Sequence, residues 1–245
     1  MKHSSILDLS NGKNRGSNVL IGRDKERNEI VDAVSQRKNL FLFGLESVGK
    51  TCIVKYVLEE IGSRGVLYSH DCSTIKTSLA GFLKGDYDST FLSCQNVLSL
   101  RKLFYKKVQK EKPYLIFDHI GSVGPRFFSY LENLLDEHPA LFIARSSDPG
   151  EIGDLSLLLF SFDKLEVHNL NRKYAYELIT HFIECFSLVI DKADYFRKEV
   201  YRLSHGNPGA IREICQYAGK DEYKIGKEIK FRLLNLDRKI DSLKL

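Results

Sequence analysis

The sequence predicts an α/β protein in which a parallel β-sheet is flanked by helices and followed by a smaller all-helical segment. Three observations support this prediction. Continuous apolar runs at 40–43, 114–117 and 140–144 are typical of strands that are buried on both faces. Stretches with apolar residues at helical spacing alternate with these runs up to about residue 169. Beyond residue 169 the chain shows helix caps and no further strand pattern.

In the first half of the chain, the pattern favours a helix after Asp24, with Ile30, Val31 and Val34 on one face. Strands are expected at 40–43 and 65–70, with a helix at 52–60 between them. Residues 73–95 receive no assignment, because Gly81 and Gly85 interrupt any helix there. A helix at 97–109 then ends before a proline at position 113.

The second half continues with a strand at 114–118, a helix from Pro125 to Asp136, and strands at 140–144 and 164–167. Helices are then expected at 173–185, 193–203 and 208–216. Their predicted caps are Asn171, Asp191 and Asn207, with Pro208 at the first position of the last helix. The helical segment therefore begins near residue 170.

Length and composition limit the classes of protein to which the chain can belong. The 245 residues suffice for one domain with a small appendage, and 43% hydrophobic with 28% charged residues is ordinary for a globular protein. No apolar run approaches the roughly 20 residues of a membrane helix, and the first residues lack the apolar core of a secretory signal. We expect no membrane contact and a cytoplasmic location. Five cysteines without C-x-x-C spacing favour reduced thiols over a zinc site.

A phosphate-binding pattern, G-x-x-x-x-G-K-[ST], lies between the strand at 40–43 and the helix that follows. Its residues are Gly44, Leu45, Glu46, Ser47, Val48, Gly49, Lys50 and Thr51, and we count the next residue, Cys52, among the nucleotide contacts. Such a turn directs backbone N–H groups and the positive end of a helix dipole at one point, which suits a polyphosphate. In this arrangement Lys50 reaches the β- and γ-phosphates, and the Thr51 hydroxyl holds Mg²⁺.

A carboxylate at the tip of a neighbouring strand is the second requirement, because it orients the water shell of the Mg²⁺ ion. Asp118 follows four apolar residues and lies at the end of the strand at 114–118. We therefore predict Thr51 and Asp118 as the metal-binding residues, and ATP and Mg²⁺ as the ligands.

Two further positions bear on catalysis. Arg145, or the neighbouring Ser146, follows the strand at 140–144 and could contact the γ-phosphate; a salt bridge unrelated to nucleotide is the open alternative for Arg145. His119 stands directly after Asp118, where many ATPases of this architecture have a glutamate that orients the attacking water. An imidazole can accept a hydrogen bond from water but is a less certain base. Glu46 and Asp71 are substitutes that the sequence does not rank.

These motifs together resemble the AAA+/STAND group of P-loop ATPases, particularly the prokaryotic, archaeal-type ATPases related to origin-recognition proteins. Ile21, Gly22 and Arg23 begin a segment that is similar to the hhGRxxE box, which in that group lies over the adenine. Lys50 and Thr51 match the Walker A motif, and Asp118 matches Walker B without its glutamate.

Other parts of the motif set match less completely. Arg145 or Ser146 falls at the sensor-1 position. The segment at 206–208 resembles the G-x-P signature of the helical lid, which implies a nucleotide contact for Pro208. Arg212 lies one turn later, at an unusual offset for a sensor-2 arginine. The resemblance covers residues 18–219.

The resemblance implies a sheet with strand order 5-1-4-3-2. The sequence itself divides into three segments: a polar, flexible arm at 1–17, a P-loop nucleotide-binding domain at 18–169, and a helical lid with a C-terminal helix at 170–245. A homo-oligomer or a partner protein is expected, because a neighbouring subunit often supplies an arginine to such sites. Arg126 and Arg172 remain open as that arginine.

The leading hypothesis is an ATP-binding module, a Mg²⁺-dependent ATPase that acts as a nucleotide-driven conformational switch. A DNA-associated role is compatible with the lysines at 97–112 and 224–239, through non-specific contacts to phosphates, although solvated helix faces also explain them. The alternative is a signalling or scaffold protein that binds nucleotide with negligible hydrolysis. A small-molecule kinase is a weaker third, because no arginine-rich substrate lid is evident.

Overall fold

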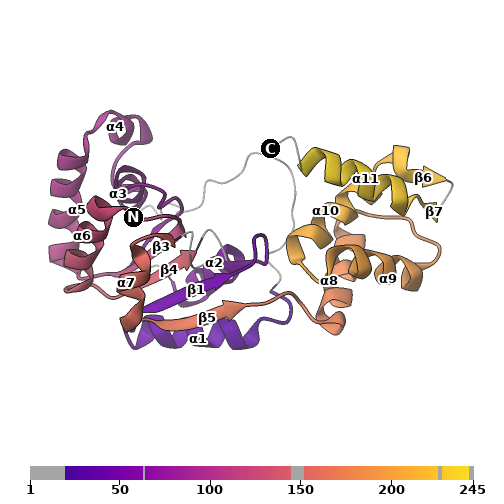
Figure 1. The fold of residues 1–245 in the computed structure, drawn as a ribbon, viewed down its shortest axis with the longest axis horizontal. Helices are drawn as coiled ribbons and strands as arrows, with labels where there is room; N and C mark the ends of the chain where they lie inside the picture. Colours follow the sequence, from indigo (N-terminus) through magenta and orange to yellow (C-terminus); the bar gives the residue numbers. More distant parts are fainter. Residues whose placement is uncertain (1–19, 63, 145–151, 226–227, 243–245) are drawn as a thin grey trace, which may run out of the picture. The chain divides into compact units, whose positions relative to one another are not determined.

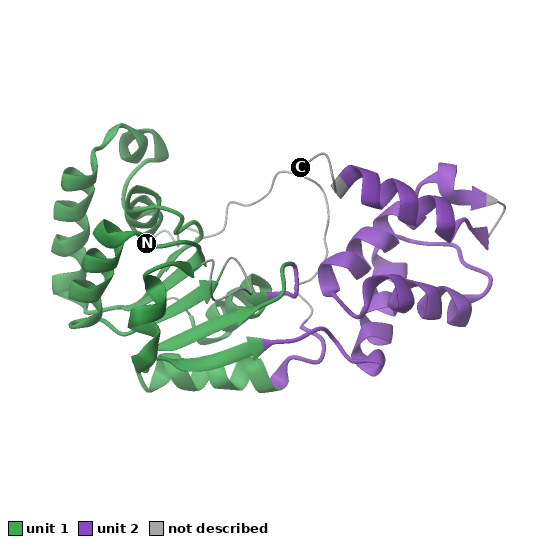
Figure 2. Ribbon diagram, viewed as in Figure 1, with its two compact units in different colours: residues 1–14, 25–46, 50–166 green, residues 15–24, 47–49, 167–245 purple. Residues whose placement is uncertain are grey.

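The computed structural model describes residues 20–62, 64–144, 152–225 and 228–242. These residues form two compact units (Figure 2). In the described part, the first unit contains residues 25–46 and 50–166, and the second contains residues 20–24, 47–49 and 167–242. The predicted arm at 1–17 lies outside the described residues, and the predicted boundary at 169–170 stays a prediction.

The first unit is built on a five-stranded sheet (Figure 1). Its strands are β1 (Leu40–Gly44), β2 (Val66–Ser69), β3 (Tyr114–Ile120), β4 (Ala140–Ala144) and β5 (Asp163–Val167). The spatial order is β2-β3-β4-β1-β5, and β1 pairs with β4, β4 with β3, and β3 with β2 in parallel. Read from the other edge, this is the expected order 5-1-4-3-2, which is confirmed.

Helices flank the sheet, and those at 24–35, 50–61, 97–111 and 125–135 were predicted from the sequence. The helices are α1 (Asp24–Ser35), α2 (Lys50–Ile61), α3 (Ile75–Leu83), α4 (Ser89–Cys94), α5 (Val97–Glu111), α6 (Pro125–Leu135) and α7 (Leu155–Leu158), which continues as η2 (Leu159–Ser161). Because strand crossovers are right-handed, the strand order places α5 and α6 on one face of the sheet and α2 on the other. On α1, Ile30 and Ala33 are buried, whereas Val31 and Val34 are only partly covered.

The core under α3, α5 and α6 contains a row of aromatic side chains. The Phe117 ring lies edge-on to Phe82, at 4.9 Å between centroids, and to Phe142, at 5.0 Å. The Phe142 ring in turn stacks on Phe162 at 4.9 Å. Aromatic pairs in these geometries add stabilisation beyond the area that they bury. The strand β3, which carries the predicted metal ligand, is thus fixed from both sides.

The unassigned segment at 73–95 forms two short helices. The Thr74 side chain caps α3 by accepting from the Thr77 backbone N–H, and Asp88 caps α4 in the same way through Thr90. Gly81 lies inside α3, where an added Cβ would stand 2.0 Å from Ser69 Oγ on β2. The glycine therefore permits close packing of α3 on the sheet and does not interrupt the helix.

The second unit is mainly helical. Its elements are α8 (Arg172–Cys185), α9 (Ala193–Ser204), α10 (Pro208–Ala218), η3 (Asp221–Tyr223), β6 (Lys224–Ile225), β7 (Glu228–Ile229) and α11 (Phe231–Ser242). Asn171 and Asn207 cap α8 and α10 as predicted. The cap of α9 is Lys192, so the prediction of Asp191 was one residue early.

One further detail of the second unit differs from expectation. The prediction of no strands beyond residue 169 was wrong, because β6 and β7 pair in an antiparallel hairpin. These strands are too short for an alternating pattern to emerge from the sequence. None of the helices in the described ranges is both long enough and apolar enough to cross a bilayer.

Candidate nucleotide-binding site

The predicted phosphate-binding loop joins β1 to α2. Gly44 and Gly49 have φ values of 138° and 101°, a backbone region that strongly favours glycine. The two glycines of the motif thus stand where the chain must turn sharply out of the strand and back into the helix. Leu45, Glu46 and Ser47 are exposed, so the outer part of the loop is accessible.

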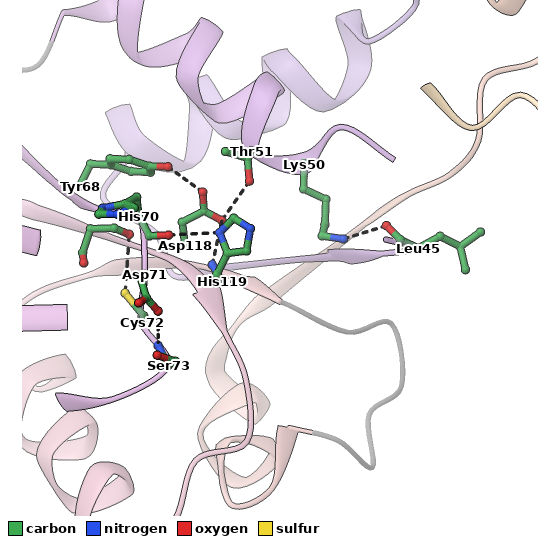
Figure 3. A network of polar contacts seen from close by, with 11 residues as sticks. Leu45, Lys50, Thr51, Tyr68, His70, Asp71, Cys72, Ser73, Asp118 and His119 are labelled. Carbon is green, nitrogen blue, oxygen red and sulfur yellow. Dashed lines mark hydrogen bonds and ion pairs between the residues drawn. The ribbon is translucent and has the colours of Figure 1, made fainter. Parts of the chain in front are cut away.

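Lys50 begins α2 and lies back across the loop (Figure 3). Its side chain is 8% exposed, and Nζ donates to Gly44 O at 2.7 Å and to Leu45 O at 2.9 Å. Burial lowers the pKa of the ammonium, and the negative charges of Asp118 and Glu46 act in the opposite direction. An ammonium carries three donors. Two of them hold the charge at the loop, and the third can donate to a ligand oxygen.

Asp118 is fully buried near the end of β3, and both of its carboxylate oxygens are engaged. Oδ1 accepts from Thr51 Oγ1 at 3.1 Å and from the His119 backbone N–H at 2.8 Å. Oδ2 accepts from the Tyr68 hydroxyl at 2.6 Å. Burial alone would raise the pKa of Asp118, but the hydrogen bonds from His119, Tyr68 and Thr51 outweigh it, so the pKa lies below its ordinary value and the group is ionised at neutral pH.

The meeting of Thr51 and Asp118 fits a magnesium ion. Mg²⁺ prefers hard oxygen ligands and usually takes only one or two protein oxygens, the rest being water and substrate phosphates. Among the described residues, no group of three or more His, Cys, Asp or Glu side chains could hold a metal by itself. The donor set therefore suits an ion that arrives with a polyphosphate, and the metal would there balance the phosphate charge.

His119 lies at an irregularity in β3. The register against β4 shifts between Phe117 and Ile120, and His119 has φ 55°. Its Nδ1 is 3.1 Å from His70 O and 3.2 Å from Asp118 Oδ1. Because a carbonyl only accepts, Nδ1 donates in the contact with His70 O. The side chain is 55% exposed, so part of the ring faces solvent.

Asp71 is less suited to orient water. Its Oδ1 accepts from the Ser73 backbone N–H at 3.0 Å, in a turn directly after β2. Hydrogen bonds from Ser73 are the main reason why its pKa is lowered. The carboxylate is thus committed to a local turn. Glu46 is exposed in the loop, and its charge bears on Lys50.

Residues 47–49 of the loop belong to the second unit together with the predicted adenine-side segment. Arg23 is 6% exposed, and its guanidinium donates to Val48 O at 3.1 Å and to His168 O at 2.7 Å. The backbone N–H of Gly209, next to Pro208, donates to Ser47 O at 3.0 Å. The Arg23 side chain therefore braces the loop through backbone carbonyls.

The remaining predicted residues fall into three groups. Ile21 packs against the core of the second unit, and Gly22 lies against the Tyr174 ring. Arg212 is exposed on α10, and Cys52 is exposed on α2. Arg145 and Ser146 lie outside the described residues. The roles assigned to all of these positions remain predictions.

Tyr68 is a site residue that the sequence did not reveal. It lies on β2, which pairs with β3 so that Tyr68 faces Ile116, two residues before the aspartate. The only available signal was a tyrosine near the end of a predicted strand, and the neighbouring strand was known only through the family resemblance. Burial and the adjacent Asp118 raise the pKa of Tyr68, so its hydroxyl stays a donor.

Comparison with solved structures places this geometry on a known fold. The ORC1 protein of Aeropyrum pernix in complex with DNA is 13% identical with a TM-score of 0.63, and the match covers 91% of this chain and 66% of that one. The ORC2 protein of the same organism, solved as ADPNP–ADP complexes, is 13% identical with a TM-score of 0.56, covering 88% of this chain and 67% of that one. This chain shares their fold.

The expected likeness to archaeal origin-recognition ATPases is thereby confirmed at the level of the fold. The chain spans about two thirds of the length of these two proteins. A signal transduction ATPase with numerous domains from Pyrococcus horikoshii also matches, at 16% identity and a TM-score of 0.46, over 85% of this chain and 31% of that one. No family model and no curated protein matches the sequence.

The Tyr68 hydroxyl offers a first prediction. Tyr68→Phe is expected to lower the free energy of unfolding by about 1.5–3 kcal/mol, the usual range for a hydrogen bond to a charged group. This bond helps to hold the pKa of Asp118 below 3.8, so its contribution is present above that pH and is lost as the pH falls through the folded pKa. Urea unfolding at neutral and acid pH measures both effects. Tyr56→Phe on α2 is the control, and an equal loss in the two variants would contradict the role of Tyr68.

Proposed function

We propose that this chain binds ATP with Mg²⁺ at the loop between β1 and α2 and hydrolyses it as a nucleotide-driven conformational switch. The observation that carries the proposal is the convergence of Lys50, Thr51 and Asp118. An ammonium is fixed across the loop, and a hydroxyl is hydrogen-bonded to a buried, ionised carboxylate. These are the groups that neutralise a triphosphate and position its metal. The ADPNP–ADP complexes of the ORC2 protein, which has the same fold, support nucleotide as the ligand.

The switching role is supported by how the loop is held. Gly44–Glu46 and Lys50 lie in the first unit, whereas residues 47–49 lie in the second and bond there to Arg23 and Gly209. A phosphate group bound by this loop would act on the backbone that Arg23 and Gly209 hold. Each nucleotide state can then favour a different arrangement through its different contacts.

The hydrolytic step depends on the residue after Asp118. We propose that the Nε2 lone pair of His119 accepts a hydrogen bond from the attacking water, with Nδ1–H held by His70 O. Loss of a general base typically costs about 100-fold or more in rate. His119→Gln is therefore expected to lower ATP turnover by about 100-fold while leaving ATP affinity unchanged.

Measuring ATP turnover also separates this function from its alternative, a scaffold protein that binds ATP with negligible hydrolysis. The replacement of glutamate by an exposed histidine favours that alternative. His119→Glu decides between them in a phosphate-release assay. A wild-type rate near zero that His119→Glu raises would establish the scaffold, whereas a measurable wild-type rate that His119→Gln lowers supports the ATPase.

A DNA-associated role is a second proposal, supported by the ORC1 protein, whose structure was solved with DNA. Lys102, Lys106 and Lys110 are exposed on α5, whereas Lys107 pairs with Asp86. We expect binding through phosphates alone, so a log–log plot of affinity against salt concentration should fall with a slope of about −2 to −3 for two or three contacts. Filter binding with and without ATP measures it. Affinity that does not change with salt would contradict the proposal.

We also propose that a second subunit or a partner protein completes the site with an arginine. Arg126 is exposed on α6. Arg172 lies over the Tyr176 ring at 5.1 Å and donates to the Tyr176 hydroxyl at 3.1 Å. Because Arg172 is engaged on its own helix, Arg126 is the better candidate.

A further inference from the structure

A groove runs between α5 and α6 within the first unit, away from the residues of the nucleotide site. It has a volume of about 860 Å³, a size that suits a ligand. Ile75 and Val97 form its half-buried apolar wall, and Arg101, Arg126 and Tyr130 supply polar groups. We call it the α5–α6 groove. None of the phosphate-loop residues, Asp118 or His119 lines it.

Three side chains that line this groove have buried polar atoms without a hydrogen-bond partner within the described part of the chain. They are Tyr130, at its hydroxyl, Arg101, at Nε, and His138, at both ring nitrogens. Tyr130 is 3% exposed, and the Arg101 guanidinium carbon lies 4.6 Å from the centroid of its ring. Burying such groups without a partner costs free energy, so each one calls for an explanation.

Arg101 Nε and the Tyr130 hydroxyl can both donate. A guanidinium only donates, and burial raises the pKa of Tyr130, which keeps its hydroxyl protonated. Two adjacent donors, one of them on a charged group, bind most strongly to an oxygen that carries negative charge. A carboxylate offers two such oxygens.

The charged groups next to these donors are also positive. Arg126 lies one turn before Tyr130 on α6, and helix side chains lean toward the N-terminus of their helix. The cap residue of α6, Gly124, provides no side-chain hydrogen bond, and the first turn of α6 contains no acidic residue to balance the positive end of the helix dipole. The residues of opposite charge, Asp136 and Glu137, line the far end of the groove, beyond the last turn of α6.

The shape favours a chain over a compact metabolite. The groove is lined from Pro125, at the start of α6, to residues just beyond its end. It therefore extends along about 16 Å of helix. A segment of that length can place a carboxylate at the donors and apolar side chains on Ile75 and Val97.

We propose that the α5–α6 groove is a docking site for an acidic peptide segment of a partner protein, whose carboxylate accepts from the Tyr130 hydroxyl and the Arg101 guanidinium. The apolar neighbours of that carboxylate pack on Ile75 and Val97. This site is separate from the nucleotide site, so the proposal does not depend on ATP hydrolysis.

The test uses fluorescence anisotropy with the full chain and a fluorescein-labelled peptide of alternating leucine and glutamate. Its counterpart, with glutamine in place of glutamate, is the matched probe. We expect the acidic peptide to bind at least 10-fold more tightly than the glutamine peptide, the scale of one charge-assisted hydrogen bond. Tyr130→Phe and Arg101→Gln should each weaken binding of the acidic peptide about 10-fold.

Controls separate the site from general charge effects. Lys106→Gln removes the same charge from α5 outside the groove and should leave peptide binding unchanged. Tyr130→Phe should melt at or above the wild-type temperature, because the hydroxyl that it removes has no described partner. Equal affinity for the two peptides would overturn the proposal, and so would equal losses in Lys106→Gln and Arg101→Gln. Succinate that binds as tightly as the peptide would also overturn it, because a free small anion would then be the ligand.

Discussion

Lys50→Ala is expected to weaken Mg·ATP binding by about 100-fold, because removing one partner of a buried, charge-assisted contact costs about 2–5 kcal/mol. The reason lies in the position of Nζ, which Gly44 O and Leu45 O hold over the loop. The ammonium is already oriented and largely removed from water. A phosphate can therefore interact with its charge without first ordering a flexible side chain.

The variant should remain folded, because alanine is favourable at a helix start and two loop carbonyls can turn to water. Lys55→Ala, on the same helix but outside the loop, is the matched control. Equilibrium titration with a fluorescent ATP analogue measures both variants. Unchanged affinity in Lys50→Ala, or an equal loss in Lys55→Ala, would show that the nucleotide does not bind at this loop.

Asp118→Asn is expected to lower Mg²⁺-dependent turnover by about 100-fold and to abolish most of the effect of Mg²⁺ on ATP affinity. The amide oxygen can still accept from Thr51 and from the His119 N–H, so the local geometry is retained. What changes is the charge, which the ion requires. ATP affinity measured without Mg²⁺ should stay equal or rise, because a negative charge near the phosphates is removed.

Asp32→Asn on α1 makes the same chemical change on an exposed surface and should alter none of these quantities. Phosphate release and ATP titration with and without Mg²⁺ give the required comparison. If Asp118→Asn kept the wild-type dependence on Mg²⁺, Asp118 would have no role at the metal.

The strands and the phosphate loop could be predicted because their signals are local. β1, β3 and β4 are runs of buried apolar residues, and the loop glycines are required by backbone angles. The order of the strands could not be read from the same signals, since it depends on contacts between distant segments; it came from the family resemblance.

Other features escaped prediction for identifiable reasons. The capping box of α3 uses Thr77 where the usual pattern has glutamate or glutamine, and Gly81 faces Ser69 only once α3 packs on β2. The bond from Tyr68 to Asp118 joins two strands that are far apart in sequence. The irregularity at His119 is a property of the register between β3 and β4, which the sequence does not display.

The most direct test of the central claim is isothermal titration of the wild-type chain with Mg·ATP and, separately, with AMP. Because Lys50, Thr51 and Asp118 address the β- and γ-phosphates and their metal, we predict saturable binding of one Mg·ATP per chain and no measurable heat with AMP. Binding of AMP as tight as that of Mg·ATP, or no binding of Mg·ATP, would contradict the assignment of this loop as a triphosphate site.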